Sequence, residues 1–401
     1  MNAISLSFRR HCLLQCWLRH LRVAFFGPCV LIAAIPAKAE AQYTFTLIAD
    51  STGPFRDFGS EPSPSLSEAG TVAFVANLDD GSFGVFRGNG GLVTTIATNP
   101  LPLGGFWYPS INQAGTVAFF EVQGNDVVER IVAGNGGPLT TIADIAGPFK
   151  RFAGGYSVSI NSAGTVAFWA AQDSGPAGIF AGNGGATTPI FLNSPSLFAN
   201  SSFSMNDAGT LAFRRSNGTG IVTANGGLIT TIADSSGPLN YFGSAPSLNE
   251  AGTVAFVAGV AGIDGGGYGI YKGNGGQLTT IADLSGPFSS FNFNSNQPSI
   301  NDSGMVAFGA GLDAGGGGVF IGDGTVTSKV IAVGDLLFGS TVTGAGVSPS
   351  SLNDSGQVAF AYTLANGTTG IAIANPVPEP GSATLVGAAM AAVGFTRRRR
   401  S

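Results

Sequence analysis

The nonapeptide Leu66-Ser-Glu-Ala-Gly-Thr-Val-Ala-Phe74 is the stretch of sequence that decides the fold. Its pattern returns at 111–119, 160–168, 205–213, 248–256, 300–308 and 352–360, which makes seven copies. The glycine of each copy follows the previous one by 45, 49, 45, 43, 52 and 52 residues. A repeat of this period is typical of β-propellers and related repeat arrays.

Each repeat has the pattern of four short strands, a to d. Strand a is a Pro-Ser-Ile/Leu segment that ends at an Asn-x-x-Gly turn, and strand b is Thr-Val-Ala-Phe with its continuation. Strand c is Gly-Ile/Val-Phe, and strand d is Leu-Thr-Thr-Ile-Ala, as at 139–143. Gly-Asn-Gly-Gly joins c to d at 88–91, 134–137, 182–185 and 273–276, because Asn-Gly supplies the positive φ angles of a tight hairpin. Strand b is apolar on both faces, as a blade packed between two neighbours requires.

The count of strands predicts how the repeat array ends. The last repeat has no strand d, whereas a lone strand d, at 44–49, precedes the first repeat. We therefore predict an all-β, seven-bladed β-propeller over residues 40–375, closed by the N-terminal strand pairing with the last blade. A linear solenoid needs distinct capping repeats, and none is visible. An open stacked β-repeat array is the alternative fold.

The N-terminal 39 residues have the pattern of a secretory signal peptide. Several arginines precede an apolar run at 23–35 and the small-x-small site Ala37-Lys38-Ala39. The run is shorter than the roughly 20 residues of a membrane span, and two prolines interrupt it. We expect signal peptidase to cleave after Ala39, and cleavage after Ala41 is the alternative.

Residues 376–401 resemble the PEP-CTERM sorting signal. Its three parts are Pro378-Glu379-Pro380, an apolar stretch at 383–395, and the cluster Arg397, Arg398, Arg399 and Arg400. The resemblance implies processing by an exosortase after transient anchoring in the inner membrane. The arginines would stay on the cytoplasmic side, which leaves the propeller outside. The copies of Asn-x-x-Gly-x-x-Ala-Phe, such as 161–168, are also similar to the tandem repeats of exported bacterial proteins that carry such tails.

Composition excludes several classes of chemistry. All three cysteines and both histidines lie within residues 1–39. Residues 40–375 therefore form no disulfide and hold no cysteine nucleophile, Ser-His-Asp triad or His/Cys zinc site. These residues include nine basic and 22 acidic side chains, a difference of −13. A domain this acidic argues against a nucleic-acid partner.

The alternation of strands predicts two different rims. The b–c and d–a loops share one rim, here called the variable rim, and the a–b and c–d turns share the other, the uniform rim. The candidate ligand residues are the aspartates of the variable rim: Asp50, Asp79, Asp80, Asp126, Asp144, Asp173, Asp234, Asp264, Asp283, Asp313 and Asp335. Carboxylates without nitrogen ligands favour calcium, and neighbouring aromatics such as Trp107 and Tyr108 suit sugar rings. The alternative is that each aspartate caps its turn and each phenylalanine packs between blades.

These observations predict an exported cell-surface or extracellular-matrix protein. Its propeller is expected to be non-catalytic and to bind polysaccharide, protein or calcium through the acidic variable rim. No cofactor other than calcium is expected. The first alternative is a glycoside hydrolase or lyase, which would need two carboxylates roughly 5–10 Å apart. The second is a purely structural spacer.

Overall fold

The computed structural model describes residues 42–59, 62–99, 104–124, 128–152, 158–192, 202–215, 218–260, 267–291 and 297–377. The signal peptide, the sorting motif with its membrane segment and arginines, and Asp126 and Asp264 lie outside these residues. All the regular structure in the described ranges is β-strand. Among these residues no helix of the length and apolarity needed for a membrane span is found.

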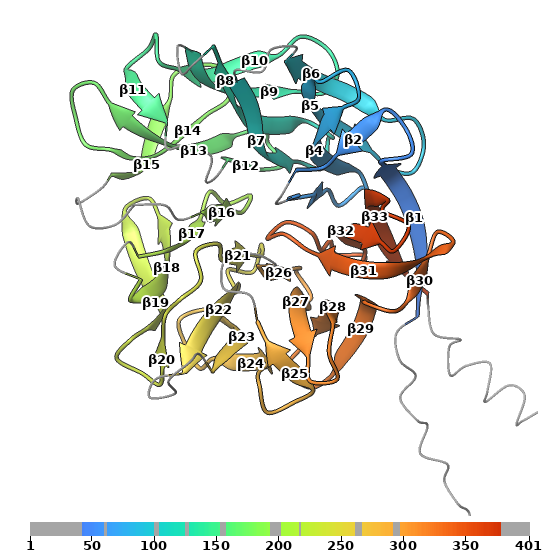
Figure 1. Ribbon diagram of the computed structural model, residues 1–401. Helices are drawn as coiled ribbons and strands as arrows, with labels where there is room; N and C mark the ends of the chain where they lie inside the picture. Colours follow the sequence, from blue (N-terminus) through green and yellow to red (C-terminus); the bar gives the residue numbers. More distant parts are fainter. Residues whose placement is uncertain are drawn as a thin grey trace, which may run out of the picture. The chain divides into compact units, whose positions relative to one another are not determined.

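Seven antiparallel sheets are arranged around a ring, each with strand a innermost and strand d outermost (Figure 1). Blade 1 comprises β2 (Phe55–Asp57), β3 (Ser65–Leu66), β4 (Val72–Leu78), β5 (Phe83–Gly88) and β6 (Thr94–Asn99). Blade 2 comprises β7 (Gly104–Ile111), β8 (Val117–Gln123), β9 (Val128–Gly134) and β10 (Thr140–Asp144). Blade 3 comprises β11 (Phe149–Phe152), β12 (Val158–Ile160), β13 (Val166–Gln172), β14 (Gly178–Gly182) and β15 (Thr188–Leu192). Blade 4 comprises β16 (Phe203–Met205), β17 (Leu211–Arg214), β18 (Gly220–Asn225) and β19 (Leu228–Asp234).

The remaining blades follow the same order. Blade 5 comprises β20 (Leu239–Asn240), β21 (Ser247–Leu248), β22 (Val254–Val260), β23 (Tyr268–Gly273) and β24 (Thr279–Ala282). Blade 6 comprises β25 (Phe288–Ser290), β26 (Ser299–Ile300), β27 (Val306–Leu312), β28 (Gly317–Gly322) and β29 (Thr327–Ala332). Blade 7 comprises β30 (Leu336–Leu337), β31 (Ser340–Gly346), β32 (Val358–Leu364), β33 (Thr369–Pro376) and β1 (Tyr43–Asp50).

Blade 7 takes its outermost strand from the other end of the propeller. β1 pairs antiparallel with β33, with Tyr43 opposite Pro376 and Asp50 opposite Gly370. Figure 1 shows the blue β1 lying along the red β33. This pairing confirms the predicted seven-bladed ring closed by its N-terminal strand, and the open array is not the fold of this chain.

Strand a differs from the prediction. In blade 1 it consists of two pieces that both pair with β4, since Phe55 lies opposite Leu78 and Ser65 opposite Ala73. The first piece begins at the phenylalanine of Gly53-Pro54-Phe55, a segment that follows Asp50. We predicted this segment to be part of a d–a loop. Phe55 is only 5% exposed, so burial against the neighbouring strands draws this segment into the sheet. Blades 3, 5 and 6 are divided in the same way, since two separate pieces pair with strand b in each.

The turns of the uniform rim join neighbouring blades. Asn112 Oδ1 accepts a hydrogen bond from Thr116 N (3.0 Å), and Asn112 Nδ2 donates to the carbonyl oxygen of Asn161 in the next blade (3.2 Å). Equivalent donations run from Asn206 to Asn249, from Asn249 to Asn301, from Asn301 to Asn353 and from Asn353 to Ser67. The motif asparagine therefore stabilises both its own turn and the contact between blades.

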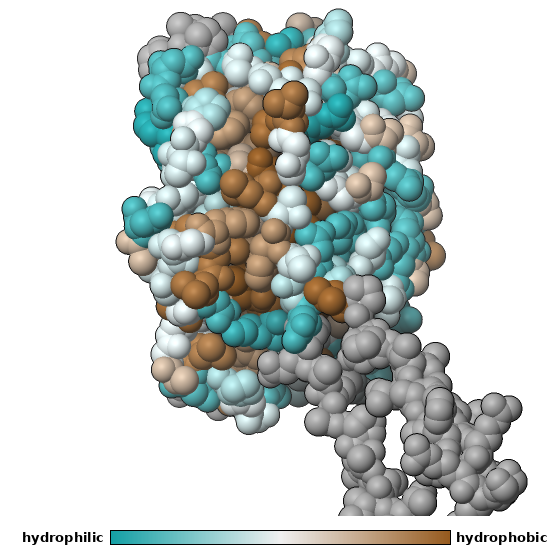
Figure 2. Space-filling view, turned by 90° about the vertical axis from the view of Figure 1, so that its right-hand side faces the viewer, coloured by the Kyte–Doolittle hydropathy of each residue, from teal (hydrophilic) through white to brown (hydrophobic). Residues whose placement is uncertain are grey.

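Part of the outer surface beside the closing blade is apolar (Figure 2). Leu47 on β1 is 38% exposed, Leu336 in β30 is 77% exposed and Phe338, directly after β30, is 41% exposed. β30 has no counterpart in the described parts of the other blades, because it pairs with β31 as an extra hairpin.

Candidate binding site

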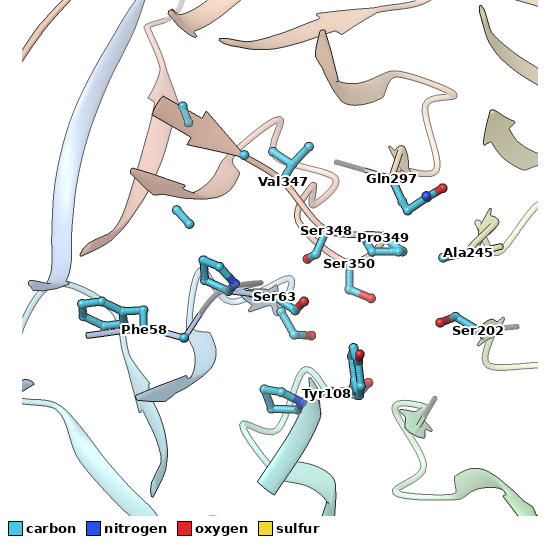
Figure 3. A pocket seen from close by; sticks show the side chains of 18 of the residues that line it. Phe58, Ser63, Tyr108, Ser202, Ala245, Gln297, Val347, Ser348, Pro349 and Ser350 are labelled. Carbon is cyan, nitrogen blue, oxygen red and sulfur yellow. The ribbon is translucent and has the colours of Figure 1, made fainter. Parts of the chain in front are cut away.

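A cavity of about 850 Å³ lies at the centre of the ring, where the inner segments of the blades meet (Figure 3). All seven blades contribute residues to its lining, among them Phe58, Tyr108, Val158, Ser202, Ala245, Gln297 and Ser350. The lining also includes Thr363 and Thr369, which flank the b–c turn of blade 7. The cavity therefore extends towards the variable rim. In blade 1, the described lining residues between the two pieces of strand a are Phe58, Gly59, Pro62 and Ser63.

Small hydroxyl side chains dominate the polar part of this lining. The serines are Ser63, Ser65, Ser110, Ser202, Ser244, Ser348 and Ser350. Figure 3 shows Ser63, Ser202 and Ser350 arranged around one central space. Among the described lining residues, the only charged side chains are Asp57 and Arg214. Several of these hydroxyls already bond within the protein: Ser65 Oγ accepts from Ile111 N, Ser110 Oγ accepts from Ile160 N, and Ser348 Oγ donates to the carbonyl oxygen of Pro64. The lining is thus polar and carries little charge.

Tyr108 lines the cavity from a strained backbone position. Its φ angle is 50°, in the left-handed region, and Pro109 follows it. The register between β7 and β8 shifts between Trp107 and Ser110, so Tyr108 lies in a bulge of the inner strand. A bulky residue in this conformation costs about 1–3 kcal/mol and persists only where the surrounding structure holds it. The bulge gives the cavity an aromatic side chain (Figure 3).

The carboxylate of Asp57 is engaged by its own neighbours. Oδ1 accepts hydrogen bonds from Gly59 N (3.0 Å) and Asn77 Nδ2, and Oδ2 pairs with Arg56 Nε at 3.1 Å. Partial burial by itself would raise the pKa of Asp57, but these hydrogen bonds and the charge of Arg56 outweigh it and lower the pKa. Asp57 is therefore held as a carboxylate and is not set up as a proton donor.

Arg214 reaches the cavity from the end of β17. Its Nη1 donates a hydrogen bond to the carbonyl oxygen of Phe242 in blade 5, at 3.1 Å. Burial lowers the pKa of the guanidinium, which means that its positive charge is partly removed from water.

Tyr362 is a buried lining residue that the sequence analysis did not single out. Its side chain is 3% exposed, and its hydroxyl has no hydrogen-bond partner among the described residues. Burial raises the pKa of this phenol, and the charge of Asp50 raises it further. The signal for it was available in the repeats, because blades 1, 3, 5 and 6 have alanine at the corresponding place, two residues after the motif phenylalanine.

Most described candidate aspartates of the variable rim bind within their own turns. Asp50, Asp144, Asp234 and Asp283 each accept a hydrogen bond from a backbone N–H two residues later. Asp80 accepts bonds from Ser82, and Asp335 pairs with Lys329 Nζ at 2.8 Å. The backbone N–H groups of Asp79, Asp173 and Asp313 donate to prolines of the preceding d–a turns. Within the described ranges, no three acidic side chains gather as a metal site would require. Calcium binding at this rim stays a prediction.

A second group of acids lies on the uniform rim and was missed in the sequence analysis. It comprises Glu68, Asp207, Glu250, Asp302 and Asp354, here called the acidic row. Each residue directly follows the first residue of the Asn-x-x-Gly turn in its blade. The backbone N–H of Asp207 donates to Glu250, that of Glu250 to Asp302, and that of Asp302 to Asp354. These acids therefore serve as acceptors between blades.

Part of this chain matches the model of a protein family of unknown function, and several solved structures of low sequence identity are similar to it. The model of the family of unknown function DUF7453 matches residues 215–348 and 336–384. No curated protein sequence matches this chain. A prolyl endopeptidase structure is 11% identical with a TM-score of 0.50, and the match covers 77% of this chain and 47% of the endopeptidase. This chain thus spans about half the length of that enzyme.

Two oligogalacturonate lyase structures are also similar. One, in complex with manganese, is 10% identical with a TM-score of 0.51 over 85% of this chain and 97% of the lyase. The other, from Vibrio parahaemolyticus, is 15% identical with a TM-score of 0.48 over 85% of this chain and 99% of the lyase. At these low identities, the likeness to the endopeptidase and to the manganese-bound lyase concerns the fold alone, and the function has to be argued from the site.

Proposed function

We propose that this chain is an exported, non-catalytic binding protein of the cell surface or extracellular matrix, and that its central cavity binds a saccharide. The observation that carries the proposal is Tyr108, an aromatic side chain held on a strained bulge at the wall of a hydroxyl-lined cavity. Such backbone outliers cluster at functional sites. Tyr241 and Phe338 have similar φ angles outside the lining, so Tyr108 is distinguished by its place at the cavity wall together with its φ angle.

The composition of the cavity suits a sugar better than an apolar ligand. Its volume falls within the roughly 300–1,000 Å³ range of small-molecule sites. Serine hydroxyls both donate and accept hydrogen bonds, as the hydroxyls of a sugar do. The face of an aromatic ring can cover the apolar face of a pyranose. These features support saccharide binding in the cavity, whereas the sequence alone predicted a ligand at the acidic variable rim.

The lining also favours binding over catalysis. Hydrolysis by a carboxylate pair requires two acids roughly 5–10 Å apart, one of them with a raised pKa. Asp57 is the single carboxylate among the described lining residues, and its pKa is lowered. In this proposal the N-terminal signal peptide directs export and is removed by signal peptidase. The C-terminal sorting tail is processed by an exosortase.

The test compares saccharide binding by three forms of the purified protein. We expect polysaccharide extracted from the producing cell's surface to bind in titration calorimetry, and Tyr108→Ala to weaken that binding roughly tenfold or more. Trp107→Ala is the matched control, because Trp107 is an exposed neighbour outside the lining. Equal loss in both variants, or no binding by the unmodified protein, would refute the proposal. Release of shorter saccharides during incubation would instead favour the hydrolase or lyase alternative.

A further inference from the structure

Arg214 occupies a position that the other six repeats leave uncharged. It directly follows the motif phenylalanine of strand b. The other copies have Val75, Phe120, Trp169, Val257, Gly309 and Ala361 at this place. A guanidinium in this position is partly desolvated, which costs free energy that an apolar side chain would not cost. Blade 4 thus carries a charge that the repeat fold itself does not need.

Arg214 is part of the cavity wall and is anchored there by a backbone carbonyl of the next blade. The side chain is one of the lining residues, and its Nη1 is fixed to the carbonyl oxygen of Phe242 at 3.1 Å. Among the described lining residues it is the only cation, and the only carboxylate, Asp57, is already paired with Arg56. An arginine presents several N–H donors in a planar fork that matches a carboxylate.

The charge of the whole domain makes this arrangement more selective. Residues 40–375 have an excess of 13 acidic over basic side chains, so the protein's general field repels anions. A negative ligand would therefore bind only where a specific cation meets it. A cavity lined with hydroxyls and a single arginine fits a ligand that is mostly hydroxyl and carries an isolated negative group.

We propose that the cavity prefers acidic saccharides, and that Arg214 binds the carboxylate of a hexuronic acid residue. This inference rests on the proposed function and adds the chemical class of the ligand.

The test measures selectivity as well as affinity. Short oligomers of a hexuronic acid and of the corresponding neutral hexose are titrated into the unmodified protein and into Arg214→Gln. The unmodified protein should bind the acidic oligomer roughly tenfold to hundredfold more tightly than the neutral one, as expected for a charge-assisted hydrogen bond. Arg214→Gln should lose that preference and keep its affinity for the neutral oligomer. Arg214→Lys, which keeps the charge, should retain part of the preference.

Arg215→Gln is the matched control, because Arg215 is the adjacent arginine, is outside the lining and donates to Thr231 Oγ1. It should leave both affinities unchanged. Equal binding of both oligomers by the unmodified protein, with loss of binding in Tyr108→Ala, would overturn this inference and leave the proposed function standing. Unchanged selectivity in a folded Arg214→Gln protein would also overturn it. Failure of both oligomers to bind would count against both proposals.

Discussion

The backbone N–H of Asp354 donates a hydrogen bond to Glu68 Oε2 across 2.9 Å, and so joins the last blade to the first. The same bond recurs between successive members of the acidic row on the uniform rim. Each carboxylate accepts a hydrogen bond from the preceding blade and faces further carboxylates. Burial raises the pKa of both Glu68 and Glu250, and the charges of neighbouring aspartates raise it further. The acidic row thus links neighbouring blades through hydrogen bonds, while its carboxylates repel one another at neutral pH.

The first prediction concerns the pH dependence of stability. A carboxyl group whose pKa is raised in the folded state stabilises the protein at low pH, and this contribution is lost as the pH rises through the folded pKa. Glu250→Gln removes the repulsion, and its amide oxygen can still accept a bond from Asp207 N. We expect the variant to be more stable than the parent at pH 7, by no more than about 1 kcal/mol because the side chain is partly solvated.

Denaturant unfolding at pH 7 and at pH 4 measures this effect. The gain should be smaller at pH 4, where the parent's carboxyl group is protonated, and smaller in high salt, which screens the charges. Asp79→Asn, at an exposed position on the variable rim and outside the acidic row, is the control for the same change in net charge. A Glu250→Gln protein that is less stable than the parent at pH 7 would contradict the prediction.

The second prediction separates the two bonds of the motif asparagine. Asn249 is 5% exposed, accepts from Thr253 N (2.8 Å) and donates to the carbonyl oxygen of Asn301 (3.0 Å). The first repeat contains a natural variant, since Ser67 accepts from Thr71 N in the same way (3.0 Å). Asn249→Ser should therefore keep the turn bond and lose only the bond between blades, at a cost of about 1–2 kcal/mol.

Asn249→Ala loses both bonds and should cost more, about 2–4 kcal/mol, because it leaves buried backbone groups unpaired. Chemical denaturation of both variants gives the comparison. If serine and alanine destabilise the protein equally, the turn bond contributes nothing and the interpretation fails.

The seven blades and their closure could be predicted because the repeats carry local information. The Asn-x-x-Gly turn, the Asn-Gly hairpin and the two-sided apolar strand b each follow from their own residues. Counting strands also revealed the closure: the last repeat lacks a strand d, and an extra strand d that ends near Asp50 precedes the first repeat. The division of strand a was not, because a two- or three-residue piece such as Phe55–Asp57 is too short to show a strand period.

The cavity could be predicted only in fragments. Tyr108 was among the aromatics named from the sequence, but its bulge and its place at the centre depend on how β7 pairs with β8. Arg214 and Tyr362 differ from the other copies at equivalent positions, a signal that appears only when the repeats are compared residue by residue. Each acid of the acidic row directly follows the first residue of its turn, so its position is visible in the sequence. Its hydrogen bonds join residues of neighbouring blades, and these contacts cannot be predicted from the sequence around each acid.

The third prediction concerns the buried hydroxyl of Tyr362. Since that group has no partner among the described residues, Tyr362→Phe should leave stability unchanged or raise it by about 1 kcal/mol. Tyr362→Ala, by contrast, removes the ring that contacts Phe338 and Phe360 and should cost about 3–5 kcal/mol. Thermal unfolding of the two variants provides the measurement. A clearly destabilised Tyr362→Phe protein would show that the hydroxyl is bonded.

The fourth prediction tests the closure of the ring with a cross-link. Thr44 lies opposite Asn375 in the β1–β33 pair, and no cysteine is present in residues 40–401. A disulfide between cysteines at these two positions would close a loop that contains almost the whole propeller. In the chain-entropy model such a bridge stabilises the fold by up to about 5 kcal/mol relative to its own reduced form.

The matched control is a bridge between Arg87 and Thr94, which lie opposite each other in β5 and β6 of a single blade. This bridge closes a short hairpin and should stabilise by roughly half as much. Unfolding of the oxidised and reduced forms of both variants gives the two gains, and each protein serves as its own reference for the loss of the native side chains. If the long bridge stabilises no more than the short one, separation of β1 from β33 is not an early step in unfolding, and closure by the N-terminal strand contributes less than its register suggests.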